Sequence, residues 1–161
     1  MGAGSRFTVL LPRMNAGATD IPLLPSAQAP RGSETILLVE DDPPVRDVVR
    51  DTLRSLGYAV LDAGNGDEAL RLAASAAERG ARIDLVLTDV VMPQTNGREL
   101  GQRLAERWPN MKIVYMSGYT DDEILRRGLM QSGITFLEKP FTPHGLAEAV
   151  RRALDEPPHS A

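Results

Sequence analysis

The sequence of 161 residues contains no cysteine, and this absence excludes several kinds of chemistry. Disulfide frameworks, thiolate nucleophiles and cysteine-ligated zinc sites all require cysteine. A chain of this length can bury an apolar core without such cross-links, so we expect one globular domain with additional segments. The lack of cysteine agrees with a reducing compartment, but exported proteins can lack it too.

The sequence also lacks segments that would direct it to membranes or to nucleic acid. No stretch approaches the roughly 20 apolar residues of a membrane span. The apolar run of residues 7–11 is too short for the core of a signal peptide, and Pro12 and Arg13 follow it. The formal net charge is −4 and no run of lysine or arginine occurs, which argues against nucleic-acid binding. We therefore expect a cytoplasmic chain with no membrane contact and no nucleic-acid partner.

The composition divides the chain into four segments. Residues 14–33 are rich in proline, alanine and glycine, a composition typical of a linker. Residues 34–155 carry the regular apolar patterns of a folded domain, and residues 156–161 form a C-terminal tail. Residues 1–13 form a separate segment that contains a strand-like apolar run.

From residue 34 onward, short apolar runs alternate with helical patterns. Each run has the length of a strand and is apolar throughout, as expected for parallel strands covered on both faces; these runs are residues 36–39, 59–61, 85–87, 113–116 and 135–137. Helical patterns follow them in residues 45–56, 66–79, 97–108, 121–131 and 146–154, and Gly57 is expected to end the first helix. Five strands that alternate with five helices predict a parallel sheet with right-handed crossovers.

Charged or hydroxyl side chains come directly after four of these apolar runs. Glu40 and Asp41 follow the first, Asp89 the third, Ser117 the fourth and Lys139 the fifth. The carboxyl ends of parallel strands meet at one edge of a sheet, where such folds place their functional groups. Clustered carboxylates repel one another and are expensive to bury unpaired, so cations must compensate them. Lys139 supplies one positive charge, and Mg²⁺ with oxygen ligands suits the remainder.

Two acidic residues that follow the first and third apolar runs, Asp42 and Asp89, have different sequence neighbours. Asp42 precedes Pro43 and Pro44 and the start of a helical pattern, so we expect it to lie at a helix N-cap. Asp89 stands at the mouth of a buried strand and has no obvious helix to cap. We therefore expect a functional role for Asp89.

With these residues at its strand ends, the sequence resembles the receiver domains of two-component response regulators and hybrid histidine kinases. Residues 36–42 resemble the first strand with its acidic pair, and residues 89–97 resemble the phosphorylation-site loop with Met92, Pro93 and a closing Gly97. The resemblance covers nearly all of the globular part. It implies a flavodoxin-like (βα)5 fold, a doubly wound parallel α/β sheet with strand order 2-1-3-4-5.

The resemblance also implies roles for the residues at the strand ends. Asp89 would be the phosphoacceptor, which attacks the phosphorus of a phosphohistidine in line. Asp41 and Asp89 would bind Mg²⁺ directly, Glu40 would bind it through water, and the backbone carbonyl of Val91 would complete the site. Lys139 would place its charge on a phosphoryl oxygen.

Other family positions concern the switch and the turns. Ser117 matches the switch hydroxyl and would turn inward to bind a phosphoryl oxygen, and Phe136 matches the aromatic residue that would follow it. The Lys139-Pro140 bond matches a motif in which this bond is usually cis. Pro93, Gly97 and Pro140 would shape the turns around the site.

A receiver is a phosphoacceptor rather than an enzyme with a separate substrate. The resemblance implies a histidine kinase or a histidine phosphotransfer protein as phosphodonor, and a monomer or weak dimer.

Two positions beside the site would control the access of water to the acyl phosphate, and Val91 and Tyr119 occupy them. Neither side chain would orient a water molecule there, so slow self-dephosphorylation is expected.

Residues 2–12 resemble the end of a histidine-kinase ATPase domain, with its last glycine-rich turn and the strand after it. On this interpretation residues 1–13 are a remnant of such a domain, and the chain is the C-terminal piece of a hybrid histidine kinase. The ATP-binding motifs of a kinase are missing from the sequence, so we do not expect kinase activity in this chain.

Three alternatives remain. Residues 64–69 fit the G-x-G-x-x-A pattern of dinucleotide-binding folds, but they follow the second strand rather than the first, so a turn and a helix start are expected. An Mg²⁺-dependent phosphatase with an aspartate nucleophile resembles D-x-D, but Val91 stands where its acid/base would be. A pseudo-receiver, a binding module without phosphorylation, is disfavoured because Asp89, the acidic pair, Ser117 and Lys139 are all present.

Overall fold

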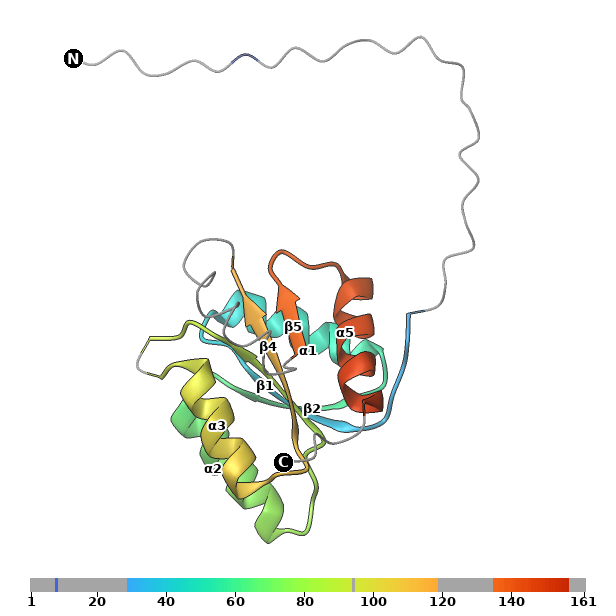
Figure 1. Cartoon of the computed structure of the whole chain (residues 1–161). Helices are drawn as coiled ribbons and strands as arrows, with labels where there is room; N and C mark the ends of the chain where they lie inside the picture. The colour runs from blue at the N-terminus through green and yellow to red at the C-terminus, as the bar shows by residue number, and fades with distance from the viewer. Residues whose placement is uncertain (1–7, 9–28, 94, 119–134, 157–161) are drawn as a thin grey trace, which may run out of the picture.

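The computed structural model describes residues 8, 29–93, 95–118 and 135–156, and Figure 1 shows them as a sheet with helices on both sides. All pairs of neighbouring strands are parallel, in the order β2-β1-β3-β4-β5. The strands are β1 (Thr35–Val39), β2 (Ala59–Ala63), β3 (Leu85–Asp89), β4 (Lys112–Ser117) and β5 (Thr135–Glu138). The predicted flavodoxin-like fold and strand order are confirmed.

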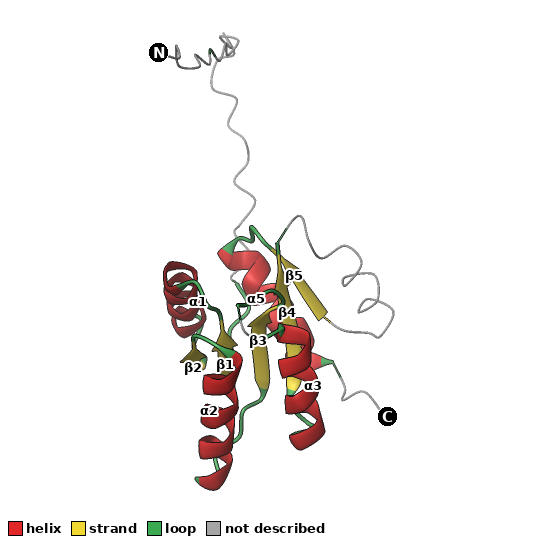
Figure 2. Cartoon of the chain, turned by 90° about the vertical axis from the view of Figure 1, so that its left-hand side faces the viewer, coloured by secondary structure: helices red, strands yellow, loops and turns green. Residues whose placement is uncertain are grey.

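Two helices cover each face of the sheet in the described part of the chain (Figure 2). Helices α1 (Pro43–Ser55) and α5 (Pro143–Asp155) pack on one face, and α2 (Gly66–Glu78) and α3 (Gly97–Arg107) pack on the other. The predicted helix of residues 121–131, the strand-like run of residues 7–11 and the tail from residue 157 lie outside the described residues. None of the described helices combines the length and the apolar sequence that crossing a membrane requires.

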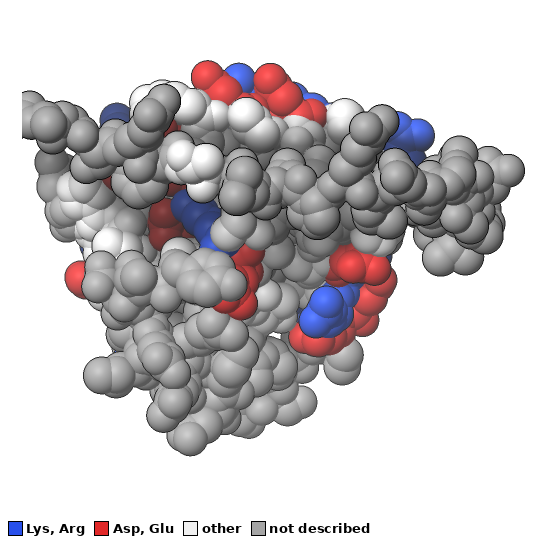
Figure 3. All heavy atoms as spheres, turned by 90° about the horizontal axis from the view of Figure 1, so that it is seen from above, with Lys and Arg blue, Asp and Glu red and all other residues white. Residues whose placement is uncertain are grey.

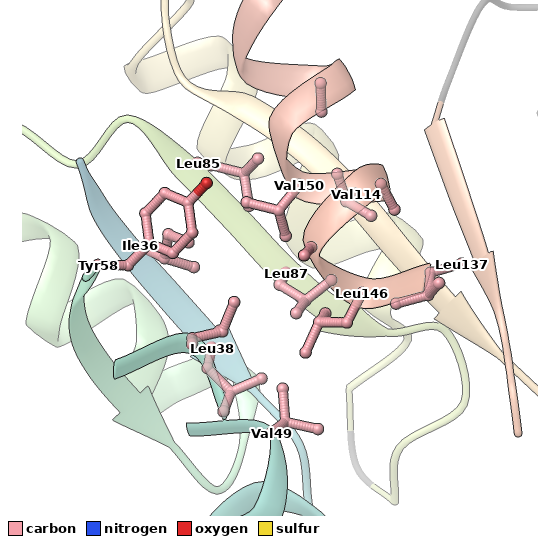
Figure 4. Close-up of a cluster of buried hydrophobic side chains, with 14 of the residues drawn as sticks. Ile36, Leu38, Val49, Tyr58, Leu85, Leu87, Val114, Leu137, Leu146 and Val150 are labelled. Atoms are coloured by element: carbon pink, nitrogen blue, oxygen red, sulfur yellow. The ribbon is translucent and has the colours of Figure 1, made fainter. Parts of the chain in front are cut away.

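Side chains of the central strands alternate between two cores. Ile36 and Leu38 of β1 point toward α1 and α5, where they meet Val49, Leu146 and other apolar side chains (Figure 4). Leu37 and Val39 point to the other face, with the alanines of α2 and the leucines of α3. The four apolar side chains of β1 are 0% exposed. Burial on both faces explains the uniformly apolar runs and gives the strand ends a rigid base.

The strands extend beyond their apolar runs because backbone pairing does not require apolar side chains. Strand β3 continues through Thr88 to Asp89, and β4 continues to Ser117. Gly57 stops the first helix as predicted: it follows the C-cap residue Leu56, and its φ of 100° is left-handed. Gly57 N–H donates to Arg54 O at 3.0 Å and Tyr58 N–H donates to Leu53 O at 3.2 Å, the two hydrogen bonds of a Schellman motif.

The N-termini of helices α1 and α2 are marked by local sequence signals. Asn65 caps α2 by accepting a hydrogen bond from Glu68 N–H at 2.9 Å, so the G-x-G-x-x-A pattern is a turn and a helix start, as predicted. Asp42 occupies the predicted N-cap position of α1, but its side chain makes no capping hydrogen bond. The two proline residues in the first turn of α1 have no backbone N–H, so they need no hydrogen-bond acceptor there, and they suit a helix start.

Candidate functional site

The parallel register places four strand ends side by side. Val39 is paired with Thr88, Asp89 with Met116, and Ser117 with Glu138. The residues that directly follow β1 and β5 therefore lie beside the ends of β3 and β4. This edge carries the acidic, hydroxyl and lysine side chains that the sequence predicted there.

Three carboxylates meet at this edge. Glu40, Asp41 and Asp89 each offer an oxygen, and these oxygens lie within 4.8 Å of one another. Glu40 is only 2% exposed, whereas Asp41 and Asp89 are half-buried. Carboxylate oxygens at this spacing are the donor set of a hard divalent cation such as Mg²⁺. The predicted ligands Glu40, Asp41 and Asp89 are thus brought together, and these residues fit the ion.

Lys139 links two of the carboxylates. Its Nζ lies 2.6 Å from Glu40 Oε2 and 2.6 Å from Asp89 Oδ2. The backbone of Lys139 is held by β4, because its N–H donates to Ser117 O at 2.8 Å. One ammonium against three carboxylates leaves an excess of negative charge at the site, which a divalent cation would balance. In the view of Figure 3, acidic side chains flank a basic one near the centre of the face.

The environment changes the pKa of both partners of this buried pair. Burial raises the pKa of Glu40 above its usual value, and the nearby charge of Asp89 adds to this, while Lys139 opposes it. Burial acts to lower the pKa of Lys139, but its hydrogen bonds to Asp89 and Glu40 dominate, so the pKa of Lys139 is raised. Lys139 therefore stays protonated and positively charged near neutral pH.

The loop after β3 fixes the orientation of Asp89. Val91 N–H donates to Asp89 Oδ1 at 3.1 Å, so one carboxylate oxygen faces the loop and the other faces Lys139. Val90 N–H donates to Met116 O and Gly97 N–H donates to Val90 O, both at 2.9 Å. A Cβ at Gly97 would collide with the carbonyl oxygen of Asp89, which explains the glycine at the end of the loop.

The remaining predicted residues of this loop have distinct environments. The side chain of Val91 is 56% exposed, and its carbonyl remains a predicted metal ligand. Pro93 is exposed, and Met92 before it packs in the core between the sheet and helices α2 and α3. Thr95 lies against Gly66 of α2, where a Cβ would come within 2.5 Å of Thr95 Cγ2. Gly66 therefore allows the loop to pack against the start of α2.

The predicted switch residues lie on adjacent strands. Ser117 at the end of β4 is 1% exposed. Phe136 on β5 stacks against Tyr115 on β4, with ring centroids 5.7 Å apart. The Lys139-Pro140 peptide bond is cis, as the resemblance implied. Tyr119, the second predicted lifetime position, lies outside the described residues.

Sequence reasoning missed one side chain that reaches this edge. Arg46 on α1 donates a hydrogen bond from Nη1 to the carbonyl oxygen of Glu40 at 2.6 Å. The acceptor is a backbone carbonyl, and no pattern of residue types in a sequence predicts which carbonyl a side chain will bind. The spacing of Arg46 in α1 could at most have shown that it lies one turn from the helix start.

Comparison with known proteins gives a consistent result for sequence and fold. The family model of the response regulator receiver domain matches residues 36–151. The chain is 35% identical to sensor kinase CckA of Brucella abortus over 97% of its own length, and it spans 17% of the length of that protein.

Solved structures match the same part of the chain. The receiver domain from hybrid histidine kinase CckA is 34% identical with a TM-score of 0.61, and the match covers 75% of this chain and 99% of that one. The chemotaxis protein CheY4 of Vibrio cholerae is 29% identical with a TM-score of 0.64, over 76% of this chain and 99% of that one.

Proposed function

The chain belongs to the response regulator receiver domain family, and from this premise we propose that Asp89 accepts a phosphoryl group from a phosphohistidine in a Mg²⁺-dependent reaction. The observation that carries the proposal is the convergence of Glu40, Asp41 and Asp89 with Lys139 at 2.6 Å from two of these carboxylates. A structural ion pair would need one carboxylate for one ammonium. The additional carboxylates fit a site for a cation.

In the proposed reaction, a carboxylate oxygen of Asp89 forms a bond to phosphorus while the bond between phosphorus and the imidazole nitrogen of the donor breaks. The electron pair of the broken bond returns to that nitrogen, and the product is an acyl phosphate. Positioning and charge stabilisation provide most of the catalysis in such transfers. The hydrogen bonds from Val91 N–H and Lys139 hold the Asp89 carboxylate in a single orientation.

Glu40, Asp41 and Asp89 would hold the Mg²⁺ ion, together with the backbone carbonyl of Val91. The bound ion would supply positive charge against the phosphoryl oxygens. Lys139 supplies another positive charge at Oδ2 of Asp89. When the phosphoryl group is present, we expect Lys139 to move from the Asp89 carboxylate to a phosphoryl oxygen, because the group then carries the charge that Asp89 has lost.

Phosphorylation is proposed to switch the surface around β4 and β5. Ser117 is buried at the end of β4, one residue beyond Met116, which is paired with Asp89 of β3, and this position supports the proposal that its hydroxyl binds a phosphoryl group on Asp89. Phe136 stacks on Tyr115, and we expect its ring to move when Ser117 moves. Such a two-position element converts a local charge change into a change of surface.

A histidine kinase or a histidine phosphotransfer protein is the proposed phosphodonor. The match to sensor kinase CckA of Brucella abortus covers 97% of this chain and so extends beyond residues 36–151 of the family model. This supports the proposal that the chain is a receiver from a hybrid histidine kinase, with residues 1–13 derived from the preceding domain. We also propose that the chain acts in the cytoplasm. The receiver acts here as a phosphoacceptor and not as a kinase.

The proposal is tested by incubation of the full chain with acetyl phosphate and Mg²⁺, followed by a gel that retards phosphorylated protein. The wild type should shift, and the shift should disappear with EDTA and in Asp89→Asn. Asp42→Asn is the matched control, because Asp42 is a neighbouring exposed acid outside the cluster. An equal shift of wild type and Asp89→Asn would contradict the proposal.

A further inference from the structure

Arg46 connects helix α1 to the residue that begins the acidic cluster. Its Nη1 donates to the carbonyl oxygen of Glu40 at 2.6 Å, a short charge-assisted hydrogen bond. On the same guanidinium, Nε lies 3.8 Å from Asp62 Oδ2 on β2. The Arg46 side chain is 19% exposed, so it lies against the protein and not in solvent.

Both peptide groups of Glu40 are held by hydrogen bonds. Its N–H donates to Ala63 O at the end of β2 at 3.1 Å, and its carbonyl accepts from Arg46. Each peptide group is planar, so fixing one atom in each plane restricts both backbone dihedral angles of Glu40. These angles set the direction of the Glu40 side chain and the starting position of Asp41. Both carboxylates of the β1 end therefore depend on the Arg46 hydrogen bond.

The turn between β2 and α2 provides the space for Arg46. A Cβ at Gly64 would lie 3.4 Å from Arg46 Nη1, in van der Waals contact, so a larger side chain would compete with the guanidinium. Gly64 N–H donates to Glu68 Oε2 at 2.8 Å, which fixes the turn. The Gly-Asn-Gly sequence that resembled a nucleotide-binding turn therefore has a packing role: Gly64 leaves room for Arg46, and Gly66 leaves room for Thr95.

We propose that Arg46 is a positioning residue for the metal site and raises its affinity for Mg²⁺ without contacting the ion. This inference rests on the proposed function. A purely structural role, in which Arg46 ties α1 to Asp62, is redundant, because Arg50 Nη1 and Arg54 Nη2 of the same helix also lie 3.6 Å and 4.0 Å from the Asp62 carboxylate. Among the hydrogen bonds of the described residues, only Arg46 reaches the Glu40 carbonyl.

The test measures Mg²⁺ affinity of the full chain by titration calorimetry with MgCl₂. Arg46→Met should weaken binding at least about tenfold, the usual effect of removing a group that orients a metal ligand. Arg50→Met is the matched control, because it also loses a contact with Asp62 but has no contact with Glu40, and it should bind Mg²⁺ as the wild type does. Arg46→Lys should recover part of the affinity, because an ammonium can also donate to the carbonyl.

Phosphorylation by acetyl phosphate provides a second measurement. In Arg46→Met the Mg²⁺ concentration for half-maximal rate should rise about tenfold, while the rate at saturating Mg²⁺ stays near that of the wild type. A loss of rate that saturating Mg²⁺ does not restore would overturn the positioning role. If Arg46→Met does not fold, Arg46→Gln against Arg50→Gln replaces the pair under the same criterion.

The controls separate this inference from the proposed function. If Arg46→Met, or its Gln replacement, binds Mg²⁺ like the wild type while Asp89→Asn binds it weakly, only the positioning role is overturned. Equal weakening in the Arg46 and Arg50 variants also overturns it, because the cause is then the shared ion pairs. If the wild type itself binds no Mg²⁺, the proposed function fails and the inference fails with it.

Discussion

Lys139 Nζ lies 2.6 Å from Asp89 Oδ2 although the two residues are 50 positions apart in the sequence. The same ammonium lies 2.6 Å from Glu40 Oε2, and Glu40 is the most deeply buried carboxylate of the site. Lys139 therefore has two tasks in the same position. It neutralises buried negative charge in this structure, and we propose that it binds the phosphoryl group after phosphorylation.

Removal of Lys139 is expected to destabilise the protein without Mg²⁺. Lys139→Met should lower the free energy of unfolding by about 2 kcal/mol in EDTA, because it leaves Glu40 without its partner. The loss is smaller than for a fully enclosed pair, since the lysine side chain is 23% exposed and Glu40 can take up a proton.

Urea denaturation in EDTA measures this change. Lys112→Met is the matched control, because Lys112 donates to a backbone carbonyl, that of Glu156, at 2.8 Å and has no carboxylate partner among the described hydrogen bonds. It should cost about 1 kcal/mol. A loss in Lys139→Met no larger than in Lys112→Met would show that the Glu40 pair adds nothing to stability.

Asp89 should affect stability in opposite ways with and without metal. Asp89→Ala removes a negative charge that faces Glu40, so in EDTA the melting temperature should stay unchanged or rise. Mg²⁺ should raise the melting temperature of the wild type more than that of the mutant, because binding to the folded state adds RT ln(1 + [Mg²⁺]/Kd). Differential scanning fluorimetry over a Mg²⁺ series tests both parts. Equal Mg²⁺ shifts in the two proteins would show that Asp89 is not a ligand.

An ion pair far from the site gives a prediction for pH dependence. Arg151 Nη1 on α5 lies 2.8 Å from Glu34 Oε1, just before β1. Burial acts to raise the pKa of Glu34, but the hydrogen bond from Arg151 and other interactions dominate, so the pKa of Glu34 is lowered below 4.5. Because the pKa of Glu34 is lowered in the folded state, its ion pair stabilises the folded protein fully above pH 4.5, and this stabilisation is lost as the pH falls through the lowered pKa.

Glu34→Gln should therefore reduce the free energy of unfolding by about 1 kcal/mol at pH 7, a small amount because the pair is partly exposed. The difference between wild type and Glu34→Gln should shrink as the pH falls below 4.5, the ordinary pKa of a glutamate. Denaturation curves at several pH values measure it. A difference that stays constant with pH would assign the effect to packing rather than to charge.

The lifetime of the acyl phosphate should depend on Val91. Its side chain is 56% exposed at the site and offers no hydrogen bond to a water molecule. Val91→Asn should accelerate the decay of phosphorylated protein several-fold, because an amide can orient the attacking water. Val48→Asn is the control, since Val48 is 68% exposed on α1 and should leave the decay rate unchanged. Unchanged decay in Val91→Asn would mean that this side chain does not control water.

The sequence was sufficient to predict the sheet and the residues at its edge for a physical reason. Parallel strands buried on both faces must be apolar throughout. The carboxyl ends of these strands can therefore be recognised in the sequence where the apolar run gives way to polar residues such as Glu40, Asp89 and Ser117. The end of α1 was also predictable, because the left-handed backbone conformation that often follows a helix strongly favours glycine, and Gly57 adopts it.

Interactions that end on backbone atoms could not be predicted. The Arg46 hydrogen bond to the Glu40 carbonyl depends on how α1 returns along β1, and the sequence around Arg46 shows only a helix. The stacking of Phe136 on Tyr115 likewise depends on the register of β4 and β5. Asp42 shows the converse case, because a residue type suited to capping occupies the N-cap and makes no capping hydrogen bond.

The most direct test of the central assignment is to locate the phosphoryl group on the protein. The chain is phosphorylated with acetyl phosphate and Mg²⁺, the acyl phosphate is reduced with borohydride, and the modified residue is identified by peptide mass spectrometry. The phosphoacceptor assignment predicts modification at Asp89 alone, and none when Mg²⁺ is removed. Modification at Asp41, Asp42 or another acidic residue with Asp89 unmodified would contradict it.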